Sequence, residues 1–331
     1  MKIQLNELNR LCVEAFLRAG VSEAQAVPTV AALVVAESQG IASHGISRVP
    51  MYLAHVRHGR VNPQAVPTVA NQLASSALIN ADDGFAFPAC DQAIRVVIEK
   101  ATATGIAIAA VTNSHHFGVA GNHLLALGQA GLVGIAMGNS PAAMPAWGGK
   151  RGTFGTNPIA AIFPRKNKSP VLIDLSLSEV ARGKIMVAAK DGKAIPLGWA
   201  LDAEGNPTTD AKAALAGMMM PMGGVKGAML ALMVEVMVTA LTGSQFGAEA
   251  DSFFVDAGNK PKLGQAFIGI NPQGLAGNAV YTDRLEALLS FILQDSDVRV
   301  PGERRFALEA RAKAEGVEIA DALIAQIKAI T

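Results

Sequence analysis

The chain has 331 residues, of which 50% are hydrophobic and 17% charged, and it carries a net charge of +1 with no long basic run. This balance excludes the positive surface that nucleic-acid binding requires. The length exceeds what one hydrophobic core usually serves, so we expect more than one lobe, and the low surface charge favours a homo-oligomer.

The chain also lacks the signals of secretion and of membrane insertion. Charged residues interrupt its N-terminal helix, which therefore has no continuous apolar core of the kind that a signal peptide needs. The longest apolar run, 228–241, is too short to span a bilayer and contains Glu235. Cys12 and Cys90 lie far apart in apolar helical patterns without zinc-site spacing. We expect a cytoplasmic protein with no membrane partner.

The first sixty residues are predicted to form three short helices. Apolar residues recur at helical spacing over 5–19 and stop at a glycine. Ser22 and Gln25 have the spacing of a capping box, which predicts a second helix running to about Gly40. The third helix is expected over 40–59.

The third predicted helix carries the strongest chemical signal. Its sequence is GIASHGISRVPMYLAHVRHG, and a helical start near Ser43 would place His44, Arg48, Tyr52 and His55 on one face. Pro50 argues for a later start, because proline removes a backbone hydrogen bond inside a helix. Histidine transfers protons near neutral pH, and arginine grips a carboxylate with two hydrogen bonds. The pair suits a small 2-oxo, 2-hydroxy or 2-imino acid, although a solvated helix face has the same spacing.

The middle of the chain alternates buried strands with helices, which predicts an α/β fold. A strand is expected at 76–80 and a helix at 88–105, and then come a strand at 106–112, a helix at 120–131 and strands at 132–137, 159–163 and 171–175. A helix is expected over 178–190, and a long buried helix after the glycines of GGVKG at 223–227. A further strand is expected at 267–271, and helices at 283–293 and 319–330 close the chain, with a turn at 300–305.

Segments rich in glycine or small polar residues follow three of these strands. They are NSHHFGVAG after 106–112, GNSPAAMPAWGGKRGTFGTNP after 132–137, and the turn Asp174 to Ser178. Ligands of α/β sheets bind beyond the carboxyl ends of strands, where glycines let backbone N–H groups approach phosphate. A dinucleotide would suit such a site, although ordinary loops have the same composition. No G-x-G-x-x-G occurs, so a nicotinamide cofactor would bind a fold other than the Rossmann fold.

Other chemistries are weaker on the residues. Adjacent histidines on an extended segment point to opposite faces, so His115, His116 and His123 do not predict a metal site. Ser43 beside His44 lacks the G-x-S-x-G context of a nucleophilic serine, which makes a hydrolase a weak alternative. Glu235, alone in its apolar helix, is read as a satisfied buried carboxylate.

Several motifs in order along the chain carry a resemblance to a known family. They are SHG at 43–45 with Arg48, NSHHFG at 113–118, GTNP at 155–158, ARGKI at 181–185, PLGWALDAEGNPTTD at 196–210, GGVKG with LALMVE, and PGERR at 301–305. With these motifs the chain resembles the type-2 malate/L-lactate dehydrogenases. The resemblance implies a non-Rossmann NAD(P)-binding α/β fold with a mixed sheet, and a homodimer. Independently of the resemblance, the helical patterns at both ends predict that a segment 1–70 packs with C-terminal helices 281–331, beside an α/β region 71–280 that binds cofactor and substrate.

The resemblance also assigns roles by motif. It makes His44 the acid/base with Ser43 as relay partner, and it places the substrate against Arg48, Thr156, Arg182 and Gly183. The implied cofactor contacts are His116, Phe117, Gly118, Val119, Ala120, Asp174, Leu175, Ser176, Val225, Lys226, Arg299, Gly302, Arg304 and Arg305. Arg304 and Arg305 would pair with a 2′-phosphate, which favours NADPH over NADH.

Within the family, ARGKIM, the GGVKGAMLALMVEV segment and SFF with GQAFIGINP are most similar to Δ1-pyrroline-2-carboxylate reductases. This predicts reduction of Δ1-pyrroline-2-carboxylate to L-proline, or of Δ1-piperideine-2-carboxylate to L-pipecolate. A malate/L-lactate-type 2-hydroxy acid dehydrogenase is the alternative, and a dinucleotide-binding sensor is the non-enzymatic one. Lys184 stands where piperideine-type reductases often have Asp, which puts a relay role for that residue in doubt.

Overall fold

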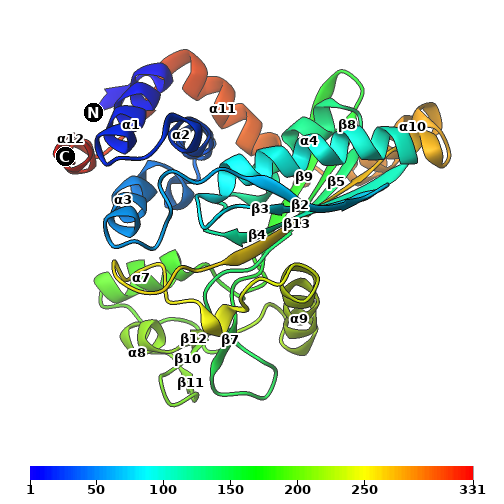
Figure 1. Ribbon diagram of the computed structural model, residues 1–331. Helices are drawn as coiled ribbons and strands as arrows, with labels where there is room; N and C mark the ends of the chain where they lie inside the picture. Colours follow the sequence, from blue (N-terminus) through cyan, green and yellow to red (C-terminus); the bar gives the residue numbers. More distant parts are fainter. Residues whose placement is uncertain (331) are drawn as a thin grey trace.

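The computed structural model describes residues 1–330, and a seven-stranded mixed sheet lies at its centre (Figure 1). The strand order is β2-β3-β4-β13-β5-β8-β9, with only the β3–β4 pair parallel. The strands are β2 (Thr68–Leu73), β3 (Ser76–Asn80), β4 (Ile106–Ser114), β5 (Val133–Gly138), β8 (Ile159–Arg165), β9 (Lys168–Leu175) and β13 (Leu263–Ile270). The predicted α/β class with a mixed sheet is confirmed, and the antiparallel pairing distinguishes it from a doubly wound sheet.

Strands β4, β5 and β9 all end at the same edge of the sheet. Strand β13 lies antiparallel between β4 and β5, so those two run in the same direction, and β8 has the same relation to β5 and β9. The three strand-end segments singled out in the sequence therefore leave the sheet in the same direction, with β13 and β8 between them. This edge is where a ligand of such a sheet would be expected.

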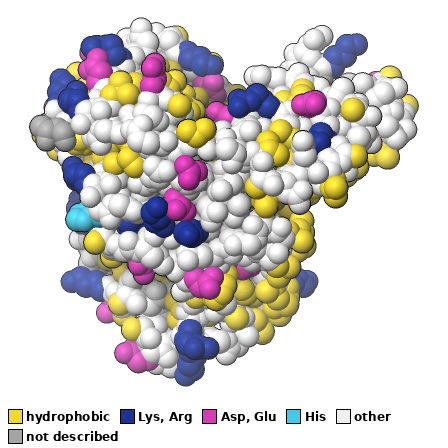
Figure 2. Space-filling view, viewed as in Figure 1, with side chains coloured by type: hydrophobic (Ala, Val, Ile, Leu, Met, Phe, Trp, Pro, Cys, Tyr) yellow, Lys and Arg dark blue, Asp and Glu magenta, His cyan; other side chains and the backbone are white. Residues whose placement is uncertain are grey.

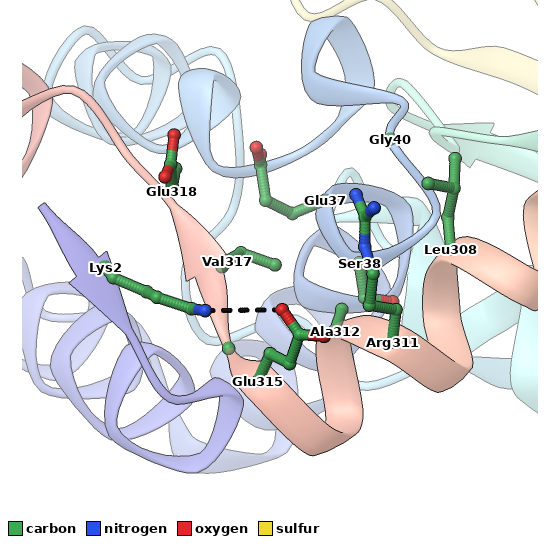
Figure 3. A pocket seen from close by; sticks show the side chains of 11 residues that line it. Lys2, Glu37, Ser38, Gly40, Leu308, Arg311, Ala312, Glu315, Val317 and Glu318 are labelled. Atoms are coloured by element: carbon green, nitrogen blue, oxygen red, sulfur yellow. Dashed lines mark hydrogen bonds and ion pairs between the residues drawn. The ribbon is translucent and has the colours of Figure 1, made fainter.

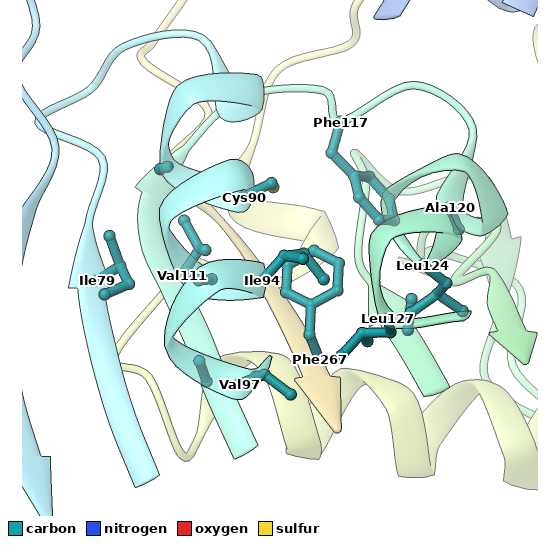
Figure 4. Close-up of a cluster of buried hydrophobic side chains, with 14 of the residues drawn as sticks. Ile79, Cys90, Ile94, Val97, Val111, Phe117, Ala120, Leu124, Leu127 and Phe267 are labelled. Carbon is teal, nitrogen blue, oxygen red and sulfur yellow. The ribbon is translucent and has the colours of Figure 1, made fainter. Parts of the chain in front are cut away.

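Helices cover both faces of the sheet. On one face lie α4 (Ala86–Thr104), α5 (Ala120–His123) and α6 (Leu125–Gln129), and on the other lies α9 (Val225–Thr239) (Figure 1). The apolar residues of α4 recur every three or four positions and pack with Leu124, Leu127 and Phe267 in the main core (Figure 4). The helix expected over 120–131 is thus two short helices that meet at Leu124.

A separate helical cluster joins the two ends of the described chain (Figure 1). Its core contains apolar residues from both ends, among them Phe16, Leu33 and Ile327. A two-stranded sheet also links those ends. The elements are β1 (Lys2–Ile3), α1 (Leu5–Arg18), α2 (Glu23–Ser38), α3 (Val49–Arg57), α11 (Glu303–Glu315), β14 (Val317–Glu318) and α12 (Asp321–Lys328). Helix α10 (Asn278–Ile292) instead lies against β8, with Arg165 paired to Glu286. The domain boundaries stay a prediction.

The remaining short elements lie below the sheet in Figure 1, around α7. They are β6 (Met144–Pro145), β7 (Gly152–Phe154), α7 (Arg182–Lys190), β10 (Ala200–Leu201), β11 (Pro207–Thr208), α8 (Ala211–Ala216), β12 (Met218–Met219) and the single turn η3 (Gly247–Glu249). The turn η4 (Pro272–Gly274) instead follows β13 and lies beside α10. Within residues 1–330, no helix is both long and apolar enough to cross a membrane.

Two local predictions near the N-terminus are wrong. The 40–59 helix is replaced over its first half by two 3₁₀ turns, η1 (Ala42–His44) and η2 (Ile46–Arg48), and α3 begins only at Val49. Pro50 falls in the first turn of α3, where its missing N–H has no intrahelical partner to lose. The Ser22–Gln25 capping box does not form, because the Gln25 amide is buried and bonds Ala65 O and Phe85 N.

Helix α9 also differs from its prediction as a buried helix. Six apolar side chains on it are 39–49% exposed, namely Val225, Met229, Leu230, Leu232, Met233 and Val236. Figure 2 shows hydrophobic side chains gathered on the surface in this region of the molecule. One face of α9 packs on the sheet, and the other is left uncovered in a single chain.

Candidate active site

The 42–48 turn, which comprises η1 and η2, is fixed from below by a carboxylate of α2. Glu37 Oε2 accepts a hydrogen bond from Ile46 N at 2.9 Å. The same carboxylate lies where a Cβ on residue 45 would be, so only glycine at position 45 leaves room for the Glu37 side chain. Arg48 Nε donates to Ser43 O at 2.6 Å and closes the turn. These contacts give a physical reason for the SHG motif.

His44 lies at the centre of this turn with an imidazole that is neutral at pH 7. Its Nδ1 is 3.0 Å from Ser43 Oγ, and its ring stacks on His116 with centroids 5.4 Å apart. His116 Nδ1 in turn meets Tyr52 Oη at 2.7 Å. Burial first and the Arg48 charge second lower the pKa of His44 to about 4. Because Nδ1 faces Ser43, Nε2 is the atom left to exchange a proton with a substrate.

Two guanidinium groups lie over one aromatic ring beside this turn. Arg48 Cζ is 5.8 Å and Arg182 Cζ 5.3 Å from the centre of the Phe254 ring. Arg182 also donates to Leu215 O, and none of the ion pairs within residues 1–330 involves either arginine. Two half-buried cations without counter-ions favour an anionic ligand.

A pocket of about 660 Å³ adjoins the 42–48 turn. It is lined by residues 39–41, which lead into the turn, and by parts of β9 and of the segment that opens α11. Six residues predicted to contact the cofactor line it, namely Asp174, Leu175, Arg299, Gly302, Arg304 and Arg305. The structure therefore brings this part of the predicted site together.

The charges of this pocket fit a phosphorylated ligand. Arg305 is tied to Asp174 Oδ2 at 3.0 Å, and the same oxygen accepts Gly121 N. Burial raises the pKa of Asp174, and Arg305 opposes that rise. Among the described residues Arg299 and Arg304 have no carboxylate partner, so they are the cations left for a phosphate. A smaller pocket of about 310 Å³ shares Gly40 and Leu308 with it (Figure 3), but there Lys2 pairs with Glu315.

The other predicted residues lie outside this pocket. Phe117 and Ala120 are buried in the main core, so only their backbone could touch a cofactor, and Gly118 has a φ of +70° between them. Predicted residues that line neither the pocket nor the 42–48 turn are Val119, Thr156, Ser176, Gly183, Val225 and Lys226. Leu177 joins two of their segments, because its N–H bonds Thr156 O and its carbonyl accepts Met222 N before the GGVKG turn. The roles of these residues stay predictions.

Residues that sequence reasoning missed surround the histidines. Phe253 and Phe254 belong to a loop whose backbone is held by buried Arg60. The SFF triplet was visible as a family motif, but no spacing signalled Arg60.

The histidines beside the site do not form a metal centre. His55 Nδ1 lies 2.9 Å from His115 Nε2. Within residues 1–330, no group of three His, Cys, Asp or Glu side chains could hold a metal ion.

Comparisons with known proteins identify the family of the chain. The chain matches the family model described as malate/L-lactate dehydrogenase over residues 3–328. It is 45% identical over 328 residues to (2R)-3-sulfolactate dehydrogenase (NADP(+)) of Chromohalobacter salexigens, covering 99% of this chain and 97% of that protein. It is 36% identical over 326 residues to Δ1-pyrroline-2-carboxylate reductase 1 of Burkholderia ambifaria, covering 98% and 96%.

Solved structures give the same result. Δ1-piperideine-2-carboxylate reductase from Pseudomonas syringae superposes with a TM-score of 0.93 at 34% identity, covering 100% of both chains. Sulfolactate dehydrogenase from Methanocaldococcus jannaschii superposes with a TM-score of 0.91 at 32% identity, covering 100% of this chain and 96% of that one. The chain therefore belongs to the malate/L-lactate dehydrogenase family and is an NAD(P)-dependent oxidoreductase.

Proposed function

We propose that this protein is an NADPH-dependent dehydrogenase of a small 2-hydroxy acid that carries a second anionic group, the class to which 3-sulfolactate and malate belong. The observation that carries the proposal is the pair of guanidinium groups, Arg48 and Arg182, over Phe254 and without carboxylate partners in the described chain. One cation suffices for a carboxylate, and a second is used by a second anion. The 45%-identical relative named (2R)-3-sulfolactate dehydrogenase (NADP(+)) supports this class.

In this proposal each residue has a distinct task. Arg48 and Thr156 hold the carboxylate beside C2, and Arg182 holds the second anion beside Gly183. His44 exchanges the proton of the C2 oxygen through Nε2, while Ser43 fixes the imidazole through Nδ1. The nicotinamide, when bound, supplies or accepts the hydride at C2. The protein's share is to position the reacting groups and to manage charge.

NADPH is the proposed cofactor because of the charges of the 660 Å³ pocket. Arg299 and Arg304 are the candidates for the 2′-phosphate, since Arg305 is already paired with Asp174. The sequence motifs suggested that Arg305 also binds this phosphate. We propose instead that Arg305 neutralises Asp174 beside the phosphate site. The relative's name, which specifies NADP(+), agrees.

Cyclic imino acids, the substrates that the sequence motifs favoured, are our second candidate. Relatives named Δ1-pyrroline-2-carboxylate reductases are 34–36% identical to the chain. The Phe254 ring, 56% exposed, offers an apolar face on which ring methylenes of such a substrate could pack. This candidate uses Arg48 alone and leaves Arg182 without an anion, which is why we place it second.

A spectrophotometric panel distinguishes the candidates. NADPH and NADH are each crossed with sulfopyruvate, oxaloacetate, pyruvate, Δ1-pyrroline-2-carboxylate and Δ1-piperideine-2-carboxylate, and nicotinamide oxidation is followed. We expect kcat/KM to be highest for NADPH with sulfopyruvate or oxaloacetate. A preference for either cyclic imine over both dianions, at equal cofactor, would replace the first candidate by the second.

A matched pair of variants tests the assigned proton carrier. Replacing a general acid–base group typically lowers kcat by about two to four orders of magnitude, and we expect this of His44→Ala. His58→Ala, on the exposed end of the same region, should retain the wild-type rate. An unchanged kcat in His44→Ala would remove this residue from the mechanism.

We also propose that the protein works as a homodimer that covers α9. Six apolar side chains on that helix are 39–49% exposed in one chain, a larger uncovered face than monomeric proteins usually carry. Light scattering should give twice the chain mass at micromolar concentration, and Met233→Glu should weaken the association. A wild-type monomer under those conditions would contradict the dimer.

A further inference from the structure

We propose that Phe254 sets the specificity of the site for a second anionic group, and that Arg60 is the positioning residue that holds the loop on which Phe254 lies. Neither residue was expected from the sequence to act in the site. The inference rests on the proposed function, because it takes Arg48 and Arg182 as the anion-binding pair.

Arg60 organises the 251–259 loop from inside. Its side chain is fully buried, and its guanidinium donates to the backbone carbonyls of residues 251, 252, 255 and 259 at 2.5–3.0 Å. Its Nη1 also lies 3.1 Å from His55 Nε2. A buried cation with four carbonyl partners fixes the loop backbone from inside, in addition to the hydrogen bonds by which Asp251 and Asn259 join the two ends of the loop.

The two phenylalanines of the loop point to different surroundings. Phe253 is 8% exposed and packs against His115 and His116, with ring centroids 5.0 and 5.2 Å apart, which anchors the loop to the histidine cluster. Phe254, the next residue, is 56% exposed and touches Arg48 and Arg182 instead. A large aromatic ring left this exposed beside two cations is better explained by what it does for them than by its own packing.

The ring orders two groups that would otherwise repel each other. The negative face of an aromatic ring attracts a guanidinium, so Phe254 holds both arginines near one place before any anion arrives. Long arginine side chains lose rotamer freedom when they bind, and prior ordering reduces that loss. A ligand with two anionic groups benefits at both arginines, whereas a monocarboxylate benefits only at Arg48. Phe254 therefore affects the discrimination between the two classes more than it affects catalysis.

Binding of two inert ligands tests the idea without turnover. The probes are 3-sulfopropionate, which has a carboxylate and a sulfonate on the same carbon chain as 3-sulfolactate, and propionate, which has the carboxylate alone. Dissociation constants are measured by calorimetry on the NADPH-saturated enzyme. We expect Phe254→Leu to weaken 3-sulfopropionate roughly tenfold and propionate by less than threefold, a size typical of two exposed cation–π contacts. Phe254→Tyr, which keeps the ring, should restore the wild-type preference, and Phe291→Leu, at an exposed phenylalanine on α10, should change neither constant.

The role of Arg60 is tested by coupling. Arg60→Met removes the four loop contacts, and Arg60→Lys keeps the charge without the geometry, so both should shift the preference as Phe254→Leu does. In the double variant Arg60→Met with Phe254→Leu the shift should be no larger than in Phe254→Leu alone, because both act through the same ring. Additive shifts would overturn the positioning role.

The outcomes separate this inference from the function on which it rests. A wild-type enzyme with no preference for 3-sulfopropionate over propionate would remove the proposed dianion site and this inference with it. A wild-type preference that survives in Phe254→Leu would leave the proposed function in place and overturn only the role of Phe254. If the Arg60 variants fail to fold, the Phe254 measurements still decide the matter.

Discussion

Binding of an anionic substrate should charge His44. Burial and the neighbouring Arg48 lower the pKa of this imidazole to about 4, so at pH 6.5 it carries almost no proton in the free enzyme. A carboxylate bound about 4 Å away contributes about 4 kcal/mol at an effective dielectric constant of about 20. That energy corresponds to about three pKa units, which would bring His44 to about 7. The acid needed for reduction is then formed only when a substrate anion is present.

The change is measurable as proton uptake. Titrating 3-sulfopropionate, which is fully ionised at pH 6.5, into the NADPH-saturated enzyme should take up roughly 0.5–1 proton per chain, since the ligand itself releases none. The uptake follows from the slope of the calorimetric binding heat against the ionisation enthalpy of the buffer, in phosphate, PIPES and imidazole.

The sign and the origin of this uptake can both be checked. Uptake should disappear above about pH 8.5, where His44 stays neutral even when its pKa is near 7. His44→Gln should abolish the uptake, and His58→Gln, at an exposed position, should preserve it. A binding heat at pH 6.5 that is the same in all three buffers would refute the coupling between substrate charge and His44.

Three further predictions concern the supports of the site. Arg48→Met should raise KM roughly tenfold by removing a charge-assisted pair worth about 1.5–3 kcal/mol, and a KM within twofold of wild type in initial-rate assays would exclude the clamp. Gly45→Ala places a Cβ where the Glu37 carboxylate lies, so we expect kcat/KM to fall at least about tenfold. The far-UV circular dichroism spectrum should stay unchanged, and wild-type kinetics would show that the 42–48 turn tolerates displacement. Glu235→Ala removes three hydrogen bonds from buried donors to a carboxylate and leaves Gly247 N without a partner, so we expect the free energy of unfolding to fall by about 3–5 kcal/mol in urea titrations. The exposed Glu204→Ala should cost less than about 0.5 kcal/mol, and a loss below about 1 kcal/mol in Glu235→Ala would be inconsistent with those bonds.

Sequence reasoning located what local patterns encode. A buried strand such as 106–112 is a continuous apolar run whichever strands it pairs with. Strand β4 therefore lies where the sequence predicted it. The segments at the strand ends were also visible, because small residues follow each run. The pairing itself was not readable, since the position of β13 between β4 and β5 depends on contacts more than a hundred residues apart.

The errors arise where tertiary contacts override local preference. Gln25 has the spacing of a capping residue, but its amide serves a buried backbone donor and acceptor instead. Helix α9 is apolar on all sides, and such a sequence predicts a helix buried within its own chain. In the structure one face of α9 is exposed instead. Phe254 reaches the site from an irregular loop, and Arg60 acts by holding that loop. No periodic sequence pattern marks residues of this kind.

The place of β13 in the sheet bears on how the protein is made. Strands β4 and β5 leave the ribosome more than a hundred residues before the strand that separates them, so each presents an unpaired inner edge during translation. The nascent sheet can close only after residue 270 has emerged. Overproduction in a host short of chaperones should therefore yield inclusion bodies, and slower translation ahead of β13 would give no relief, because it prolongs the interval in which those edges are open.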